Sequence, residues 1–252
     1  MEKLKLLGGD RGLFICEAIS APVEKILDIG CSYGWTLNAL TGKAQTLVGI
    51  DMNEAALSQA QSDYPHIQFT HQSAEVLPYN SNEFDVVILS EVIEHVGDAK
   101  KQLVIDEAHR VLKCDGVFIF TAPYAGLFSW ADPMDFKRRF PHLYRLYMRL
   151  SQYTPATSIE IGHKHISLDE VEALFRNRFD IEHIRYCGLF MPFLTWILAV
   201  DTRIKLLPQR FHDGLNRFRG WESGVKYPKA LTFNIRIIAR KKHISPLVKD
   251  TA

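Results

Sequence analysis

Short apolar runs alternate with stretches of helical composition between residues 25 and 121, and this alternation constrains the fold more than any other feature of the sequence. The apolar runs predict strands over 25–29, 45–50, 67–71, 84–89 and 117–121. Between them we expect helices over 35–40, 55–62 and 100–112, and a turn over 114–116. Strands that alternate with helices form a parallel sheet with helices on both faces, and continuously apolar strands fit a sheet buried on both sides.

The second half of the chain has a looser pattern. Helices are expected over 143–151 and 168–177, the latter with Ser167 as N-cap and Glu170 at the spacing of a capping box. Strands are expected over 180–186 and 231–240, and the roughly 44 residues between them are too many for a hairpin loop, so they predict an inserted helical segment. The whole pattern predicts an α/β, Rossmann-like sandwich with a seven-stranded, mostly parallel sheet.

Composition excludes several classes of protein. Of the 252 residues, 47% are hydrophobic and 23% are charged, which excludes disordered, collagen-like and coiled-coil chains. The four cysteines form no C-x-x-C pair, which argues against a cysteine zinc site and a secreted disulfide framework. The N-terminus has no apolar core of a signal peptide, and the longest apolar run, 187–200, falls short of the ~20 residues that span a bilayer. We therefore expect a cytoplasmic protein.

Charge is distributed unevenly along the chain. Residues 1–120 hold 9 Lys and Arg against 17 Asp and Glu, a net charge of −8, whereas residues 121–252 hold 21 against 12, a net charge of +9. Two interpretations stay open: the first half is acidic by chance, or the basic second half meets an anionic substrate or a membrane surface.

The segment Ile26–Gly34, ILDIGCSYG, joins the first strand to the first helix through two glycines. Glycines let backbone approach a ligand closely, and Asp51, which follows the second strand, can accept hydrogen bonds from ribose hydroxyls. Ser32 stands where the dinucleotide motif G-x-G-x-x-G has glycine, which disfavours a nicotinamide dehydrogenase and favours a nucleoside cofactor without phosphate. A purely structural turn is the alternative.

Three ordered motifs at this point resemble those of the class I S-adenosylmethionine-dependent methyltransferases. They are Asp28–Gly34, Gln72–Pro78 and Arg110–Gly116, and the resemblance covers about residues 22–125 and extends more loosely to 240. It implies that the Asp28–Gly34 loop passes the methionine half of the cofactor, that Asp51 holds the ribose, that Met52 lies against adenine and that Ser73 binds the adenine amino group. The implied cofactor-binding residues are Asp28, Gly30, Ser32, Gly34, Asp51, Met52, Ser73, Ala74, Glu75 and Ser90.

The segment Ser90–Val96 follows the fourth strand and carries Glu91, Glu94 and His95 at the spacing i, i+3 and i+4, which on a helix places all three on one face. His95, with Glu91, is a candidate general base for a substrate hydroxyl. Alternatively, the three bind Mg²⁺ or Mn²⁺. The E-x-x-E-H pattern resembles the ubiquinone-biosynthesis O-methyltransferases and the small-RNA terminal 2′-O-methyltransferases, whose further metal-binding histidine would correspond to His163 or His165. A structural role is the third possibility.

The second half carries the candidate acceptor site. Arginines interleaved with aromatics follow the segment 128–133 and suit an anionic or ring-bearing acceptor, or a helix with a solvated face. The segment 188–207 is apolar and then basic residues follow, which fits a membrane interface, a cover for the sheet edge or a dimer contact. No RNA-binding module is visible and the isoelectric point is 7.7, so nucleic acid is not expected as a partner.

Together these features predict a single methyltransferase domain over 1–240, with a cofactor core at about 22–125, acceptor elements at 123–165, an insertion at 188–230 and a tail at 241–252. The expected reaction is methylation of a hydroxyl on a small or lipid-linked molecule, such as a glycan, a glycolipid or a quinone precursor. The alternatives are a metal-dependent RNA-terminal 2′-O-methyltransferase and a non-catalytic module that binds S-adenosylmethionine. No obligate protein partner is evident, and a peripheral location at the inner face of a membrane is the alternative to the cytoplasm.

Overall fold

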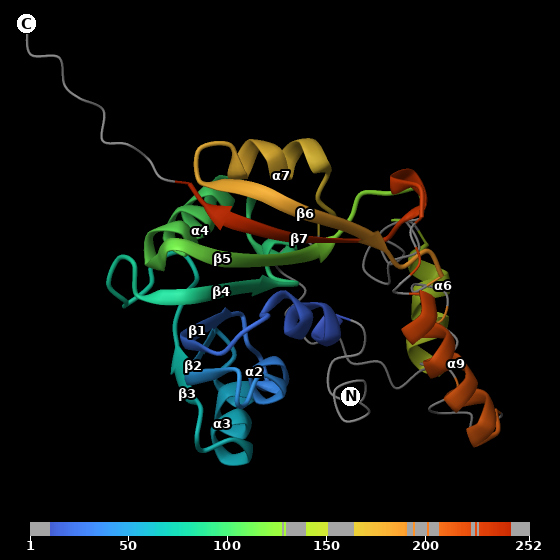
Figure 1. The fold of residues 1–252 in the computed structure, drawn as a ribbon. Coiled ribbons are helices and arrows are strands. Elements are labelled where there is room, and N and C mark those ends of the chain that lie inside the picture. Colours follow the sequence, from blue (N-terminus) through green and yellow to red (C-terminus); the bar gives the residue numbers. More distant parts are fainter. Residues whose placement is uncertain are drawn as a thin grey trace, which may run out of the picture.

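The computed structural model describes residues 11–127, 129, 140–150, 164–190, 194, 201, 207–222, 225 and 227–242. Its centre is a seven-stranded sheet in the order β3-β2-β1-β4-β5-β7-β6 (Figure 1). β1 to β5 are parallel to one another, and β7 runs antiparallel between β5 and β6. The strands are β1 (Val23–Ile29), β2 (Ala44–Asp51), β3 (Gln68–His71), β4 (Phe84–Ser90), β5 (Leu112–Pro123), β6 (Phe179–Cys187) and β7 (Asn234–Lys241).

Helices cover both faces of this sheet, as the sequence predicted. The named helices are α2 (Trp35–Ala39), α3 (Glu54–Asp63), α4 (Asp98–Val111), α6 (Pro141–Leu150), α7 (Leu168–Phe175) and α9 (Gln209–Glu222), with short 3-10 helices η1 (Ile93–His95) and η3 (Lys229–Leu231). The seven strands and the mostly parallel sheet are confirmed. In Figure 1, β4 and β5 run toward the side of the molecule on which α6 and α9 project.

Two apolar clusters show why the strands are apolar on both faces. One face of the sheet packs on α4 and α7, through residues such as Val104, Phe175 and Phe118. The other face, through Ile88 and Ile119, packs on α2 and on a helix over residues 11–18. Burial of both faces supplies the main stabilisation, at roughly 25 cal/mol per Å² of apolar surface.

The boundary between α4 and β5 differs from the prediction. β5 begins at Leu112, immediately after the helix, so the predicted turn over 114–116 is wrong. The segment is instead an irregular part of the strand: the register with β4 shifts between Phe84 and Val86, and Asp115 has a φ of 63°. Phe84 and Val86 of β4 pair with Leu112 and Val117, so β5 holds three extra residues at this point. Such an irregularity and a turn use similar residues.

The predicted cap of α7 is confirmed. The Ser167 hydroxyl accepts a hydrogen bond of 3.1 Å from the backbone N–H of Glu170. The Glu170 carboxylate in turn accepts a bond of 2.6 Å from the ammonium of Lys101 on α4, which is buried. This ion pair, in which only the lysine is buried, joins α4 to α7 on the same face of the sheet.

The region before β7 is only partly described. Its described part includes α9 and η3, which agrees with the expected helical insertion, and β7 begins at residue 234 rather than 231. Most of the apolar segment 188–207, the acceptor segment 128–133 apart from Ser129, and most of the tail 241–252 lie outside the described residues. Within the described part of the chain, no helix is long and apolar enough to cross a membrane. The proposed domain boundaries remain predictions.

Candidate active site

The loop between β1 and α2 has three residues in a backbone conformation that glycine adopts most readily. Gly30, Ser32 and Gly34 have φ values of 77°, 48° and 72°, all in the left-handed region. The N–H groups of Gly30 and Cys31 donate to the carbonyl of Ile50 at 2.8 and 2.9 Å, which anchors the loop to the end of β2. A Cβ atom at Gly30 would lie 2.2 Å from Cγ2 of Val92, so the space above this glycine is already filled.

Asp51 lies at the end of β2 and binds the same loop through its side chain. One carboxylate oxygen accepts a hydrogen bond of 2.8 Å from the N–H of Ser32, and the other accepts one of 2.8 Å from the N–H of Asn53. Each carboxylate oxygen can accept more than one hydrogen bond. Asp51 can therefore hold the loop and still accept from two neighbouring hydroxyl groups, as the ribose role predicted for it requires.

Asp28 lies one strand away, near the end of β1, and its side chain is almost fully buried, with 3% exposed. Burial raises the pKa of this carboxyl to about 7; the charge of Arg11 opposes the shift and that of Asp51 adds to it. A carboxyl with such a pKa ionises readily when a cation approaches. Asp28 thus offers a buried partner for a positively charged group held by the glycine loop.

The other predicted cofactor residues have separate environments. Met52, next to Asp51 in the chain, is 62% exposed. The Ser73 hydroxyl accepts a bond of 3.2 Å from the N–H of Glu75, whose carboxylate pairs with Lys100 at 3.0 Å. Ala74 packs against the apolar core. The hydroxyls of Ser90 and Thr121 are 2.9 Å apart.

The prediction that Glu91, Glu94 and His95 share a helical face is wrong. Glu91 has a φ of 56° and precedes η1, which is a single 3-10 turn over Ile93–His95. Glu94 is buried and lies 3.9 Å from Nε2 of His95, while the side chain of His95 is 29% exposed. The strained residue at 91 interrupts the helical repeat, so Glu91 points elsewhere.

Glu91 instead forms a network that sequence spacing did not predict. Its Oε1 accepts a hydrogen bond of 2.8 Å from the Thr121 hydroxyl and one of 3.1 Å from the side-chain amide of Asn234. Its Oε2 lies 3.8 Å from a guanidinium nitrogen of Arg11. Glu91 directly follows β4, and its partners come from β5, β7 and the helix over residues 11–18. None of them belongs to a local motif: the strand order brings Thr121 and Asn234 to Glu91, and the packing of the helix on the sheet brings Arg11.

The described residues do not support the predicted Mg²⁺ or Mn²⁺ site. Among them, no three His, Cys, Asp or Glu side chains gather closely enough to hold a metal ion. His163 lies outside the described residues. His165, the other candidate, is buried with its ring edge-on to that of Phe233 at 5.3 Å.

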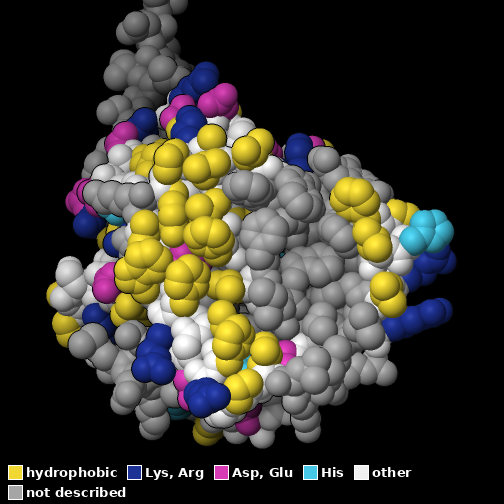
Figure 2. All heavy atoms as spheres, turned by 90° about the vertical axis from the view of Figure 1, so that its right-hand side faces the viewer, with side chains coloured by type: hydrophobic (Ala, Val, Ile, Leu, Met, Phe, Trp, Pro, Cys, Tyr) yellow, Lys and Arg dark blue, Asp and Glu magenta, His cyan; other side chains and the backbone are white. Residues whose placement is uncertain are grey.

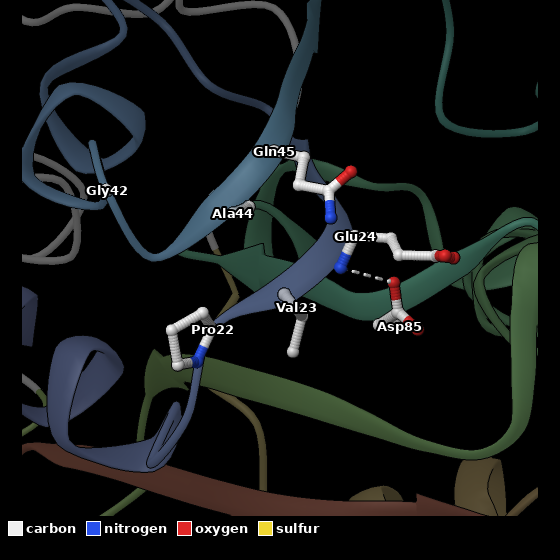
Figure 3. A pocket seen from close by; sticks show the side chains of 7 residues that line it. All are labelled: Pro22, Val23, Glu24, Gly42, Ala44, Gln45 and Asp85. Carbon is white, nitrogen blue, oxygen red and sulfur yellow. Dashed lines mark hydrogen bonds between the residues drawn. The ribbon is translucent and has the colours of Figure 1, made fainter.

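A hollow of about 440 Å³ lies at the opposite edge of the sheet, where β1 and β2 begin. Figure 3 shows that Glu24 and Asp85 line it, and the N–H of Glu24 donates to Asp85 at 3.1 Å. Lys113 forms ion pairs with the same two carboxylates. Ligands of open α/β sheets bind at the carboxyl ends of the strands, so this hollow is on the wrong edge for a cofactor.

Comparison with known proteins finds similarity to methyltransferases. Residues 27–120 match the family described as methyltransferase domain. The uncharacterized methyltransferase sll0829 of Synechocystis is 35% identical over 98 residues, which cover 39% of this chain and 46% of that protein. A ubiquinone biosynthesis O-methyltransferase of Pseudomonas entomophila is 35% identical over 116 residues, which cover 43% and 48%. The chain thus spans about half the length of these relatives.

The fold likeness extends further than the sequence likeness. The crystal structure of YcgJ from Bacillus subtilis superposes with a TM-score of 0.59 over 93% of this chain and 99% of that one, at 19% identity. The sheet order and the antiparallel β7 are therefore those of a Rossmann-like methyltransferase fold. The family match over residues 27–120 includes the glycine loop and Asp51.

Proposed function

We propose that this chain is an S-adenosylmethionine-dependent methyltransferase that acts on a hydroxyl group of a small or lipid-linked molecule. The observation that carries the proposal is the arrangement around Asp51: its two oxygens bind the glycine loop and the turn after β2, next to an exposed Met52. The match of residues 27–120 to the methyltransferase domain family supports it.

The residues of this edge fit the proposed cofactor. Asp51 has hydrogen-bonding capacity for the two ribose hydroxyls, and the left-handed glycines keep side chains away from the loop. Asp28 provides a buried carboxyl for the positive charge of the methionine half. When bound, S-adenosylmethionine supplies a methyl group on a sulfonium, which reacts with an oxygen nucleophile in line.

The residues of this chain then have to orient the acceptor and remove its proton. Glu91 is held by Thr121 and Asn234 at the carboxyl ends of β4 and β5, beside the proposed cofactor site. A carboxylate fixed in this way can accept the hydroxyl proton, and His95, partly exposed on η1, is the second candidate base. Neither role requires a metal ion. Beyond this proton removal, the rate of methyl transfer depends mainly on holding the acceptor close to the methyl group in the right orientation.

A lipid-linked acceptor is supported by the exposed side chains of α6 and α9. Leu143 and Leu146 on α6, and Phe211 and Trp221 on α9, are large apolar side chains that are each at least 45% exposed. Figure 2 looks onto the side of the molecule on which these helices project, and hydrophobic side chains gather there with Lys and Arg at their edges. Such a surface fits peripheral contact with an anionic membrane.

Calorimetric titration with S-adenosylmethionine, with and without Mg²⁺, tests the proposal, and NADH serves as the competing cofactor. We expect S-adenosylmethionine to bind saturably and Mg²⁺ to leave its affinity unchanged. We expect NADH not to bind. Asp51→Ala should abolish binding. Asp63→Ala removes the same charge at the exposed end of α3, where Asp63 contacts Gln59, and should bind as the wild type does. Binding of NADH alone, or no binding of S-adenosylmethionine to folded protein, refutes the proposal.

A further inference from the structure

The turn between β2 and α3 carries Asp51 and Met52, two of the proposed cofactor-binding residues. The N–H of Asn53 donates to the Asp51 carboxylate, and the Asn53 side chain caps α3 by accepting a bond of 3.1 Å from the N–H of Ala56. Gln72, just beyond β3, donates its N–H to the carbonyl of Asp51 at 3.1 Å. The shape of this turn therefore depends on both α3 and β3.

His71, the last residue of β3, adds a side-chain contact to the same turn. β3 is an edge strand of the sheet, and α3 packs against it (Figure 1). The His71 ring lies between two oxygen atoms: Nε2 is 3.1 Å from the carbonyl oxygen of Met52, and Nδ1 is 3.2 Å from a carboxylate oxygen of Glu54, the first residue of α3. One imidazole ring thus joins the end of β3 to the residue on each side of Asn53.

The chemistry of these two oxygens decides which charge state of His71 fits its position. A carbonyl oxygen and a carboxylate oxygen only accept hydrogen bonds, and a neutral imidazole has one N–H and one nitrogen lone pair. In either tautomer of the neutral ring, a lone pair therefore faces an oxygen that cannot donate. Only the protonated ring, with an N–H on both nitrogens, satisfies Met52 and Glu54 at the same time.

Charged groups of three elements flank His71. Glu54 faces it from α3, and Asp51 lies opposite it on β2. Glu75, in the loop after β3, pairs with Lys100 at 3.0 Å. The side chains of His71 and Glu54 are 45% and 76% exposed, so water screens their pair and its contribution is modest. Because imidazole changes charge between about pH 5 and 8, the two contacts of the ring should be complete in mildly acidic solution and incomplete in mildly alkaline solution.

We infer that His71 is a positioning residue for the nucleoside part of the cofactor. The protonated ring fastens Met52 and Glu54, whereas the neutral ring loses one of these contacts and loosens the turn that carries Asp51. The inference rests on the proposed function and adds a proton-dependent contact to it. His71 acts through the backbone of the turn and does not have to touch the ligand. Affinity for the nucleoside should therefore fall as the pH rises.

5′-Methylthioadenosine is the probe that tests this role. It has the adenine and the ribose of S-adenosylmethionine, but neither the sulfonium nor the amino acid that Asp28 would attract. Calorimetric titration at constant ionic strength from pH 5.5 to pH 8.5 should show the affinity of the wild type falling about threefold, as the loss of an exposed ion pair allows. His71→Gln keeps an N–H that can donate to the Met52 carbonyl but has no charge to lose, so its affinity should not change with pH.

Glu54→Gln provides the sharpest contrast. The amide of glutamine can accept a hydrogen bond from a protonated ring and donate one to a neutral ring, so the contact should persist at every pH. We expect this variant to bind methylthioadenosine with little dependence on pH. At pH 8.5 it should bind about threefold more tightly than the wild type, a gain that simple damage to the turn would not produce.

His66→Gln is the matched control, because His66 is also an exposed histidine next to β3 but its ring contacts the Thr41 hydroxyl, at 3.2 Å. This variant should keep the pH profile of the wild type. The inference is refuted if the wild-type affinity does not fall with pH, if His71→Gln retains the fall, or if Glu54→Gln binds no more tightly than the wild type at pH 8.5.

Calorimetry with S-adenosylmethionine separates the two hypotheses. If S-adenosylmethionine does not bind to the folded protein, the proposed function is refuted. If it binds while methylthioadenosine does not, only the role of His71 is refuted, because the turn that His71 fastens would then hold no nucleoside.

Discussion

The two ends of the candidate site are built in different ways. The cofactor end, around β1 and β2, is shaped by backbone: left-handed residues at 30, 32 and 34, and N–H groups that donate to Asp51 and Ile50. The proposed acceptor end, around Glu91, β5 and β7, is shaped by side chains that come from distant parts of the chain, such as Arg11, Thr121 and Asn234.

The two ends should therefore tolerate different substitutions. A loop shaped by its backbone should fail when a Cβ atom is added, and should change little when nearby side chains other than Asp28 and Asp51 are shortened. A site made of side chains should behave in the opposite way. Substitutions chosen at both ends can therefore test the distinction.

The largest effect is expected for Gly30→Ala. The added Cβ would lie 2.2 Å from Cγ2 of Val92 in a backbone with a φ of 77°. We expect the free energy of unfolding to fall by about 4 kcal/mol and cofactor binding to be lost, because the loop has to move. Urea denaturation and calorimetry measure the two effects.

Gly42→Ala is the control for backbone strain, because Gly42 also has a positive φ of 85° but has open space at the Cβ position. Gly42→Ala should lower the free energy of unfolding by about 1 kcal/mol and leave cofactor binding unchanged. The double variant Gly30→Ala with Val92→Ala should recover part of the loss. Equal losses at the two glycines would show that crowding at the loop is unimportant.

A second, smaller effect is expected from Asp28, which should make the free energy of unfolding depend on pH. In the unfolded chain the pKa of an aspartate is ~3.9, whereas burial raises the pKa of Asp28 to about 7 in the folded protein. Between these values the unfolded chain releases a proton that the folded protein keeps, so stability is full below pH 4 and is lost as the pH rises to 7. The loss is of the order of 4 kcal/mol or less.

Denaturation of the wild type and of Asp28→Asn from pH 4 to pH 8 measures this contribution as the difference between the two curves. The free energy of unfolding of the wild type, relative to that of Asp28→Asn, should fall as the pH rises through this range and level off above pH 7. The curve of Asp63→Asn should run parallel to that of the wild type. S-adenosylmethionine should bind the wild type more tightly as the pH rises through 7, because its cation favours ionised Asp28. Parallel curves for wild type and Asp28→Asn would contradict the buried-carboxyl interpretation.

The same contrast explains what could be predicted from the sequence. The strands and the loop of the cofactor end are local features, so hydrophobic runs and the spacing of Gly30, Gly34 and Asp51 were enough to predict them. The partners of Glu91 were not predictable in this way. Thr121, Asn234 and Arg11 lie 30, 143 and 80 positions from Glu91 along the chain. Strand order makes Thr121 and Asn234 its neighbours, and packing of the helix over residues 11–18 on the sheet adds Arg11.

The error at residues 91–95 has a local cause. A spacing of i, i+3 and i+4 predicts a shared face only if the backbone is helical throughout. Glu91 is in the left-handed region, where its N–H donates to the carbonyl of Thr121. This bond extends the pairing of β4 with β5 by one residue and turns Glu91 away from Glu94. The pattern of hydrophobic residues does not reveal a single residue with a left-handed backbone.

The third prediction concerns side chains at the acceptor end. Thr121→Val removes the hydroxyl that donates to Glu91 and contacts Ser90, and it leaves the shape of the buried side chain almost unchanged. We expect a loss of about 1–3 kcal/mol in the free energy of unfolding, because two polar groups lose a partner. Affinity for S-adenosylhomocysteine should change less than about threefold. Thr46→Val on β2 is the control and should cost little; equal costs would show that the network adds no stability.

The smallest effect is expected on the surface of the second half. If α6 contacts a lipid surface, Leu143 and Leu146 leave water on binding while Arg145 and Arg149 attract anionic headgroups. Replacing both leucines by serine should weaken binding to vesicles of phosphatidylglycerol and phosphatidylcholine about fivefold, measured by co-sedimentation. Leu103→Ser, which changes an equally exposed leucine on α4, should bind as the wild type does. A wild type that does not sediment with these vesicles, or a double variant that sediments equally well, would restrict the acceptor to molecules in free solution.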